Sequence, residues 1–257
     1  MIPIRFSQGH LNLLERCPRQ FQHTYLDQLA SPHSLEQQER QVWGSRFHLL
    51  MQQRELGLPI ESLIQEDAQL QRWMTAFTST VPEILTPTTS YTLRESEHCR
   101  TLQVQDYLLT VIYDLLIAGE SAQILDWKTY SQPQNRRWLE FNWQTLLYLY
   151  VLTQTSDYLP EQISMTYWFI QSPDKPQSLK FTYSSTQHQR IREKLHQLLS
   201  QLTVWLSRYQ QGEPFPQIAS NERCHSCPFA VRCQRERYSE EDVGNSLSLA
   251  NIQEVSL

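Results

Sequence analysis

The middle of the chain is a run of β-forming segments, and this run constrains the fold more than any other feature. Between Tyr91 and Tyr130 the sequence holds short stretches of Thr, Val, Ile, Leu and Tyr, with Gly119 and Glu120 between two of them. β-branched and aromatic residues favour strands, and glycine favours the turns between strands. We therefore predict antiparallel strands joined by turns, which form the central sheet.

Helical patterns lie on both sides of this region along the sequence. Apolar residues recur at helical spacing in two short segments after Ser7, and then in residues 35–56, 60–77 (less regularly), 138–153 and 185–210. Two more strands are predicted at 163–170 and 179–183. This order of elements predicts an α/β or α+β fold rather than a repeat protein.

The length and composition predict a single folded domain. The chain has 257 residues, of which 40% are hydrophobic and 19% charged, as in proteins with a packed core. Its expected parts are a helical N-terminal part (1–80), a sheet core (88–183), a helix with a cysteine-rich tail (185–238) and a polar, frayed end (239–257).

Charge and hydropathy limit the possible partners. No basic stretch followed by an apolar run begins the chain, and no eighteen apolar residues occur in succession, so we expect a cytoplasmic protein without a membrane partner. The net charge of −5 argues against non-specific coating of nucleic acid, which lysine and arginine drive. A local basic groove is compatible with that total.

Cysteines near the C-terminus have the spacing of metal ligands. Cys224, Cys227 and Cys233 form a Cys-x2-Cys-x5-Cys array, so three thiolates can converge on one metal centre that needs a fourth ligand. Cys17 and Cys99 are the candidates, and we choose Cys17 because a proline follows it, as one follows Cys227. Spacing alone leaves open a zinc site closed by another side chain, such as His225, or reduced structural cysteines.

Two carboxylates and a lysine occur where the sheet is predicted. Asp126 and Lys128 are two residues apart in a strand, so they project to the same face. Asp114 interrupts the apolar run 108–117, and a divalent metal shared with Asp126 would compensate its charge. Taken alone, Asp-x-Lys is more often a surface ion pair.

Three further polar residues frame these groups. Gln144 and Tyr148 are four apart on a predicted helix and face the same direction. His48 follows Gly44 on the helix before the sheet. Taken singly, His48 is more often a hydrogen-bonded core histidine, and Tyr148 a packed aromatic.

The order of these parts resembles that of RecB-like nucleases of the PD-(D/E)XK superfamily. The resemblance rests on four motifs in sequence, which are Gly44-x3-His48, Asp114, Asp126-x-Lys128 and Gln144-x3-Tyr148, and on the opening segment from Leu13 to Tyr25. It extends to the iron-sulfur members, CRISPR-associated exonucleases among them, because one cysteine precedes the core and three follow it.

The resemblance implies a restriction-endonuclease-like core, an α/β fold with a mixed central sheet flanked by helices. It also implies a 4Fe-4S cluster that joins the N- and C-terminal segments through Cys17, Cys224, Cys227 and Cys233. The implied activity is a Mg²⁺- or Mn²⁺-dependent DNA nuclease, an exonuclease that prefers single-stranded DNA in repair, recombination or CRISPR adaptation.

The resemblance also assigns roles to the site residues. The expected metal ligands are His48, Asp114, Asp126 and the backbone carbonyl of Trp127. Lys128 is expected to position the attacking water, and Gln144 and Tyr148 to hold the strand. Candidates for base stacking are Trp127, Trp138, Trp143 and Tyr130, and Arg136 and Arg137 are either phosphate contacts or a solvated charged loop.

Two rival hypotheses remain at this stage. The first is a catalytically inactive DNA-binding or scaffold module with a structural iron-sulfur or zinc site, against which the presence of Asp114, Asp126 and Lys128 argues. The second is a metal protein of unrelated function, which would leave these three residues far apart. The sequence contains no Gly-x4-Gly-Lys-Ser/Thr phosphate loop, so a helicase or integrase would be a separate partner.

Overall fold

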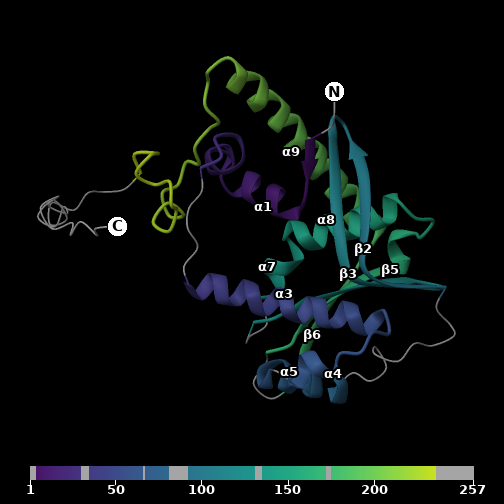
Figure 1. Ribbon diagram of the computed structural model, residues 1–257. Helices are drawn as coiled ribbons and strands as arrows, with labels where there is room; N and C mark the ends of the chain where they lie inside the picture. Colours follow the sequence, from purple (N-terminus) through teal and green to yellow (C-terminus); the bar gives the residue numbers. More distant parts are fainter. Residues whose placement is uncertain are drawn as a thin grey trace, which may run out of the picture.

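A mixed six-stranded sheet forms the centre of the molecule (Figure 1). The structure is a computed structural model that describes residues 4–29, 35–65, 67–80, 92–130, 135–171 and 175–235. The strands are β1 (Ile4–Phe6), β2 (Leu93–Val104), β3 (Tyr107–Ala118), β4 (Ala122–Lys128), β5 (Ile163–Phe169) and β6 (Gln177–Thr182). The end expected to be frayed, 239–257, lies outside the described residues.

The strand order combines antiparallel and parallel pairs. It runs β1-β3-β4-β5-β6, and β2 pairs with β3 off this path. The pairs β1–β3 and β4–β5 are parallel, whereas β2–β3, β3–β4 and β5–β6 are antiparallel. The expected α/β fold with a mixed sheet flanked by helices is therefore confirmed. The three-residue β1 was not predicted.

The helices of the N-terminal part lie in the predicted segments, but the predicted stretch 60–77 is two helices, the second of which continues to Thr80. They are α1 (Gln8–Arg16), α2 (Pro18–Phe21), the π-helix η1 (Gln22–Leu26), α3 (Leu35–Glu55), α4 (Glu61–Gln65) and α5 (Ala68–Thr80). After α3, Gly57 has φ +69°, a left-handed conformation that glycine adopts without a steric penalty. This conformation ends α3 at the place where the sequence predicted a stop.

One predicted helix, 138–153, is two helices, so that prediction was wrong. They are α7 (Arg136–Glu140) and α8 (Trp143–Gln154). Asn142 separates them, because its side-chain oxygen accepts a hydrogen bond from the backbone N–H of Gln144 at 2.9 Å and caps a new helix. Farther along the chain come the 3-10 helix η2 (Pro160–Gln162) and α9 (Ser185–Gln210), whose bounds match the predicted 185–210.

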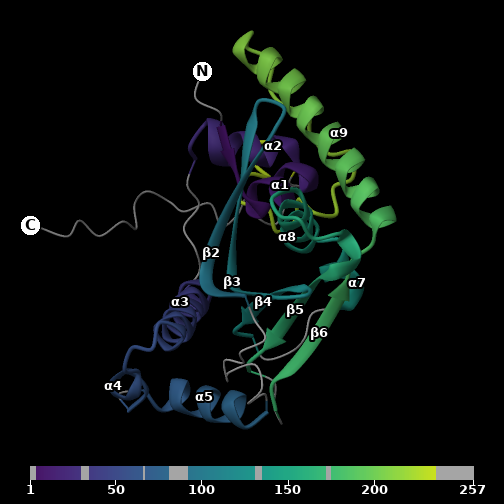
Figure 2. The same cartoon turned by 90° about the vertical axis from the view of Figure 1, so that its right-hand side faces the viewer.

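The β2–β3 hairpin is long and bends sharply partway along its length (Figure 2). Tyr113 belongs to the core on the α8 side of the sheet, but Leu115, two residues later, belongs to the core on the α3 side. In a straight strand these two residues would share a face. The alternation of β3 therefore changes phase at Asp114, which places this carboxylate at the bend.

Helices cover the two faces of the sheet and form two cores (Figure 2). On one face α1, α2, α8 and α9 pack around a large core that includes Leu11, Phe21, Trp143, Leu147 and Leu199. On the other face α3 and α5 pack through Phe47, Met51, Trp73 and Phe77 against Trp127 and Trp168. A strand buried on both faces holds ionisable groups only where they are paired or functional.

The N-terminal segment is joined to the end of α9 and to the chain that follows it. Arg19 Nε donates to the carbonyl of Phe215 at 2.6 Å, and the Phe215 N–H donates to Gln22 Oε1 at 2.7 Å. Tyr209 donates through its hydroxyl to Asp27 at 2.6 Å. These hydrogen bonds join the two segments directly. Among the described residues, no helix has both the length and the apolar character needed to cross a membrane.

Candidate active site at the bend of the sheet

Asp114 lies where β4 leaves β3. The β3–β4 ladder ends at the pair Leu115 and Leu125. One residue farther, the Asp114 carboxylate accepts a hydrogen bond from the Trp127 N–H at 2.6 Å, in place of a backbone carbonyl. The side chain of Asp114 is 9% exposed. The bend therefore fixes Oδ2 of Asp114, while Oδ1 faces His48.

Asp126 and Lys128 lie side by side on the α8 face of β4. Lys128 Nζ is 2.5 Å from Asp126 Oδ1, and Asp126 is only 1% exposed. Their neighbours Leu125 and Trp127 pack into the α3 core instead. A buried carboxylate in this position needs a compensating cation, which Lys128 supplies.

Gln144, in the first turn of α8, connects these two groups. Its side-chain N–H donates to Asp126 Oδ2 at 2.5 Å, and its oxygen accepts from Lys128 Nζ at 2.9 Å. The structure thus brings Gln144, Asp126 and Lys128 into one hydrogen-bonded group. Gln144 orients both charged side chains.

His48 reaches the same site from α3, on the other face of the sheet. Its Nε2 lies 3.1 Å from the carbonyl oxygen of Trp127, and its Nδ1 lies 3.4 Å from Asp114 Oδ1. One turn earlier, a Cβ on Gly44 would come within 3.3 Å of Thr129 Oγ1. The Gly-x3-His motif therefore has a physical reason, because the glycine lets α3 approach the end of β4 closely enough for His48 to reach it.

The sequence interpretation missed one acidic residue of the site, Glu97. It lies on β2 at the bend, and its Oε1 is 3.9 Å from His48 Nδ1. The ladder pairs Ser96 with Leu115 and His98 with Tyr113 but skips Glu97. Glu97 has φ +51°, a left-handed conformation that costs a non-glycine residue of order 1 kcal/mol or more. Backbone strain of this kind concentrates at functional sites.

Three of these side chains could hold a metal ion together. Ligand atoms of His48, Glu97 and Asp114 all lie within 4.8 Å of one another, and nitrogen and carboxylate oxygen ligands suit a divalent cation. If the Nε2–H of His48 donates to the Trp127 carbonyl, Nδ1 is left as an acceptor aimed at the carboxylates. Asp126 is outside this group, because Lys128 and Gln144 occupy its oxygens.

The pKa values of the site reflect an excess of buried negative charge. Burial raises the pKa of Asp126 to about 6, although Lys128 acts in the opposite direction. Burial lowers the pKa of His48, but hydrogen bonds that its ring donates to the carboxylates of Asp114 and Glu97 outweigh this effect and raise that pKa to about 10. The site therefore favours a positive charge beside its carboxylates, either a proton on His48 or a bound cation.

The other residues that the sequence suggested as DNA contacts differ in how far they are exposed. Tyr148 is 3% exposed, and its ring packs edge-on against Tyr113 at a centroid distance of 5.3 Å, so it lies beneath the site rather than on the surface. Trp127 and Trp143 are buried core residues, whereas Trp138 is 55% exposed. Arg136 and Arg137 begin α7, so the loop interpretation of these two was wrong.

The four cysteines of the predicted cluster line one small cavity. Cys17, at the start of α2, faces it together with Cys224, Cys227 and Cys233. Burial raises the pKa of the Cys233 thiol, Arg19 lowers it, and the other three cysteines raise it, as neighbouring thiols do. Cys99 is exposed on β2 and does not line this cavity.

Known proteins resemble this chain in fold and in sequence family. A solved structure of a candidate exonuclease from Eubacterium rectale has a TM-score of 0.56 and 11% identity, over 94% of this chain and 93% of that chain. A structure of SSO0001 has a TM-score of 0.44 and 15% identity, over 91% and 87%. No curated protein matches the chain. The family model described as PD-(D/E)XK nuclease superfamily matches residues 5–234, and the chain belongs to this superfamily of nucleases.

Proposed function

We propose that the chain is a Mg²⁺- or Mn²⁺-dependent deoxyribonuclease that hydrolyses phosphodiester bonds, an exonuclease of the RecB-like branch that prefers single-stranded DNA. One observation carries the proposal. Two buried carboxylates from different strands, Asp114 and Asp126, lie in one site with Lys128, and the second rival hypothesis required these residues to be far apart. DNA repair, recombination or CRISPR adaptation, beside a helicase or integrase, is the proposed setting.

In this proposal the residues divide into ligands and positioning groups. His48, Glu97 and Asp114 would hold the divalent ion. Asp126 and the Trp127 carbonyl would complete the ligand set once Asp126 gives up its contacts with Lys128 and Gln144. Once bound, the ion supplies a water of lowered pKa and neutralises charge on the phosphate oxygens. Lys128 orients the attacking water and stabilises negative charge on the phosphate. Gln144 holds the side chains of Lys128 and Asp126 in place through its hydrogen bonds to both.

The test of the activity is a cleavage assay with end-labelled DNA. The purified protein is incubated with single-stranded and duplex oligonucleotides of the same sequence, with Mg²⁺, with Mn²⁺ or with EDTA. The Asp126→Ala variant is the control for contaminating nucleases. We expect the parent protein to shorten the single strand when a metal is present, and the Asp126→Ala variant to leave it intact. A circular single strand that stays intact would support exonuclease action, and a parent protein without activity would contradict the proposal.

Glu97 is the ligand that distinguishes this site from the one expected from the sequence. Replacing Glu97 with glutamine keeps the size of the side chain but removes its charge. We expect the affinity for Mn²⁺ to fall by about tenfold, since loss of one interaction around a metal typically costs 10- to 100-fold. Mn²⁺ binding is followed by titration calorimetry without DNA, so the result does not depend on activity.

The matched control for Glu97 is its neighbour Glu95. Glu95 is exposed on the same strand and pairs with His98, away from the group that could hold a metal. Glu95→Gln is expected to bind Mn²⁺ as the parent does. Equal affinities for Glu97→Gln and Glu95→Gln would remove Glu97 from the ligand set.

We also propose a 4Fe-4S cluster on Cys17, Cys224, Cys227 and Cys233, whose side chains line one cavity. Three of these thiols come from one short segment, and the fourth lies at the start of α2. Four cysteine thiolates are the usual ligand set of such a cluster. A zinc ion is the alternative occupant, and metal analysis of the purified protein distinguishes the two.

A further inference from the structure

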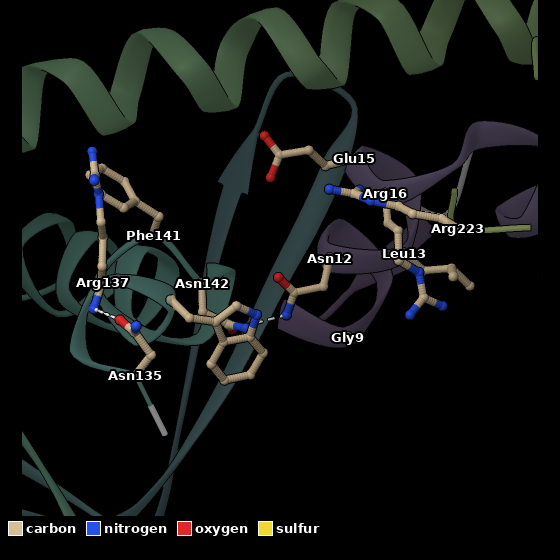
Figure 3. A pocket seen from close by; sticks show the side chains of 11 residues that line it. Gly9, Asn12, Leu13, Glu15, Arg16, Asn135, Arg137, Phe141, Asn142 and Arg223 are labelled. Atoms are coloured by element: carbon tan, nitrogen blue, oxygen red, sulfur yellow. Dashed lines mark hydrogen bonds between the residues drawn. The ribbon is translucent and has the colours of Figure 1, made fainter. Parts of the chain in front are cut away.

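A large pocket opens beside the candidate active site, between α1 and the α7–α8 corner (Figure 3). Its volume is about 1210 Å³, which exceeds the 300–1,000 Å³ of a typical small-molecule site. Its lining includes Asn12, Arg16, Asn135, Arg137, Trp138, Phe141, Asn142 and Arg223. The size of the pocket indicates a polymer with several units inside it rather than one small ligand.

Two large aromatic side chains of this pocket are exposed. Trp138 is 55% and Phe141 is 59% exposed. Trp138 lies within α7, and Phe141 follows its last residue. The neighbouring Leu139 is 1% exposed and anchors α7 in the core. An anchored short helix and the residue after it thus hold two rings in solvent, which is an arrangement that can stack unpaired bases.

The charge of the pocket is positive although the chain is acidic. Arg137 lies on one wall, and Arg16 and Arg223 lie on the opposite wall (Figure 3). None of these three arginines forms an ion pair with another described residue, and Arg16 donates only to the neutral Gln20. The one acidic residue of the lining, Glu15, is paired with Lys194 at 2.8 Å. Unpaired guanidinium groups on both walls suit a phosphate backbone.

The floor of the pocket leads to the catalytic group. Asn12 donates to Asn142 Oδ1 at 3.0 Å (Figure 3), and Asn142 caps α8 through the N–H of Gln144. Gln144 in turn contacts Asp126 and Lys128. The pocket lining therefore reaches Asn142, which is two positions along the chain from the glutamine that orients the carboxylate and the lysine.

We propose that this pocket binds single-stranded DNA, with bases stacked on Trp138 and Phe141 and phosphates on Arg137, Arg16 and Arg223. Duplex DNA keeps its bases stacked on one another, so the two exposed rings give it no comparable contact. The inference rests on the proposed function, since it places the substrate strand of that same site and explains the preference for a single strand.

The test measures binding without cleavage. A fluorescently labelled 20-nucleotide thymidine strand is titrated in EDTA, and its anisotropy is recorded. Trp138→Ala and Phe141→Ala are each expected to weaken binding about tenfold, the effect of losing one stacked base. Trp138→Phe keeps an aromatic ring and should bind within about twofold of the parent, and so should Arg72→Ala, an exposed arginine on α5.

The role of the arginines is tested by the salt dependence of binding in the same assay. Each phosphate contact to a single strand contributes about 0.7 to the slope of log affinity against log salt concentration. Arg137→Ala is expected to reduce that slope by about this amount, and Arg72→Ala to leave it unchanged. Unaltered binding by Trp138→Ala, Phe141→Ala and Arg137→Ala would overturn the proposal. Equal losses for the single strand and its duplex would overturn the stacking.

Cleavage with Mn²⁺ separates this proposal from the proposed function. If the parent binds the strand but does not cleave it, while the pocket variants lose binding, the proposed DNA-binding pocket is supported and the proposed nuclease activity is contradicted. If the parent cleaves the strand and the pocket variants bind and cleave it equally well, the nuclease activity is supported and the proposed DNA-binding pocket is contradicted. Because Trp138 and Phe141 are exposed, their replacement should leave the melting temperature unchanged, which thermal denaturation checks.

Discussion

Replacing Lys128 with alanine is expected to slow DNA cleavage by about a thousandfold, the upper range for losing one group that stabilises charge in a transition state. Lys128 Nζ is held 2.9 Å from Gln144 and 2.5 Å from Asp126, and its ammonium lies 5.2 Å from the centroid of the Tyr167 ring. This is a fixed, desolvated positive charge. Water that replaces the missing side chain cannot supply such a charge, so the rate rather than DNA binding should fall.

The same substitution should leave the protein folded. Lys128 lowers the pKa of Asp126, which burial raises to about 6. Loss of the lysine therefore favours the neutral carboxyl further, which limits the cost of leaving Asp126 buried without its partner. We therefore expect similar circular dichroism spectra and a modest change in melting temperature for Lys128→Ala.

The control for Lys128 is Lys180, an exposed lysine on β6. Lys180→Ala removes the same number of atoms and the same charge from a position away from Asp126. Single-turnover cleavage of the labelled strand is measured for the parent and both variants at equal protein concentration. Parental rates for Lys128→Ala would remove the lysine from the mechanism, and a loss by Lys180→Ala as large as that by Lys128→Ala would point to a general effect of charge.

Much of this arrangement follows from local patterns in the sequence. The period of two in β4 predicted that Asp126 and Lys128 would share one face while Leu125 and Trp127 packed on the other, and the structure has this arrangement. The helical period predicted α9 to the residue, since serine at its start and glycine after its end punctuate a strong apolar pattern.

The features that sequence reasoning missed depend on tertiary structure. Glu97 joins the site because β2 and β3 bend together at Asp114. This bend arises from packing on both faces of the sheet, so no local sequence pattern predicts it. β1 has three residues and gains its place by pairing with β3. The break before α8 had a local signal in Asn142, but the apolar pattern continues across it and concealed the cap.

Loss of the proposed 4Fe-4S cluster is expected to lower the stability of the protein strongly. Cys17 and Cys224 are 224 − 17 = 207 positions apart, and a link that closes a loop of 100 residues or more stabilises a protein by about 4 to 5 kcal/mol in the chain-entropy model. For a chain of this size that corresponds to about 10 to 15 °C in melting temperature. The hydrogen bonds of Arg19 and Gln22 to the segment after α9, and that of Asp27 to Tyr209 in α9, remain, so we expect loosened ends rather than global unfolding.

The measurement compares Cys224→Ser with Cys99→Ser under anaerobic conditions. The parent and Cys99→Ser should be brown, with broad absorbance near about 400 nm from iron-thiolate charge transfer and about four irons and four sulfides per chain. Cys224→Ser should lose this colour and melt at the lower temperature, because Cys224 lines the cysteine cavity and Cys99 does not. Hydrogen exchange should rise in α2 and in the segment after α9 but not in β4. A colourless parent containing one zinc ion would contradict the cluster, and equal melting temperatures for the two variants would contradict its role in joining the two ends of the fold.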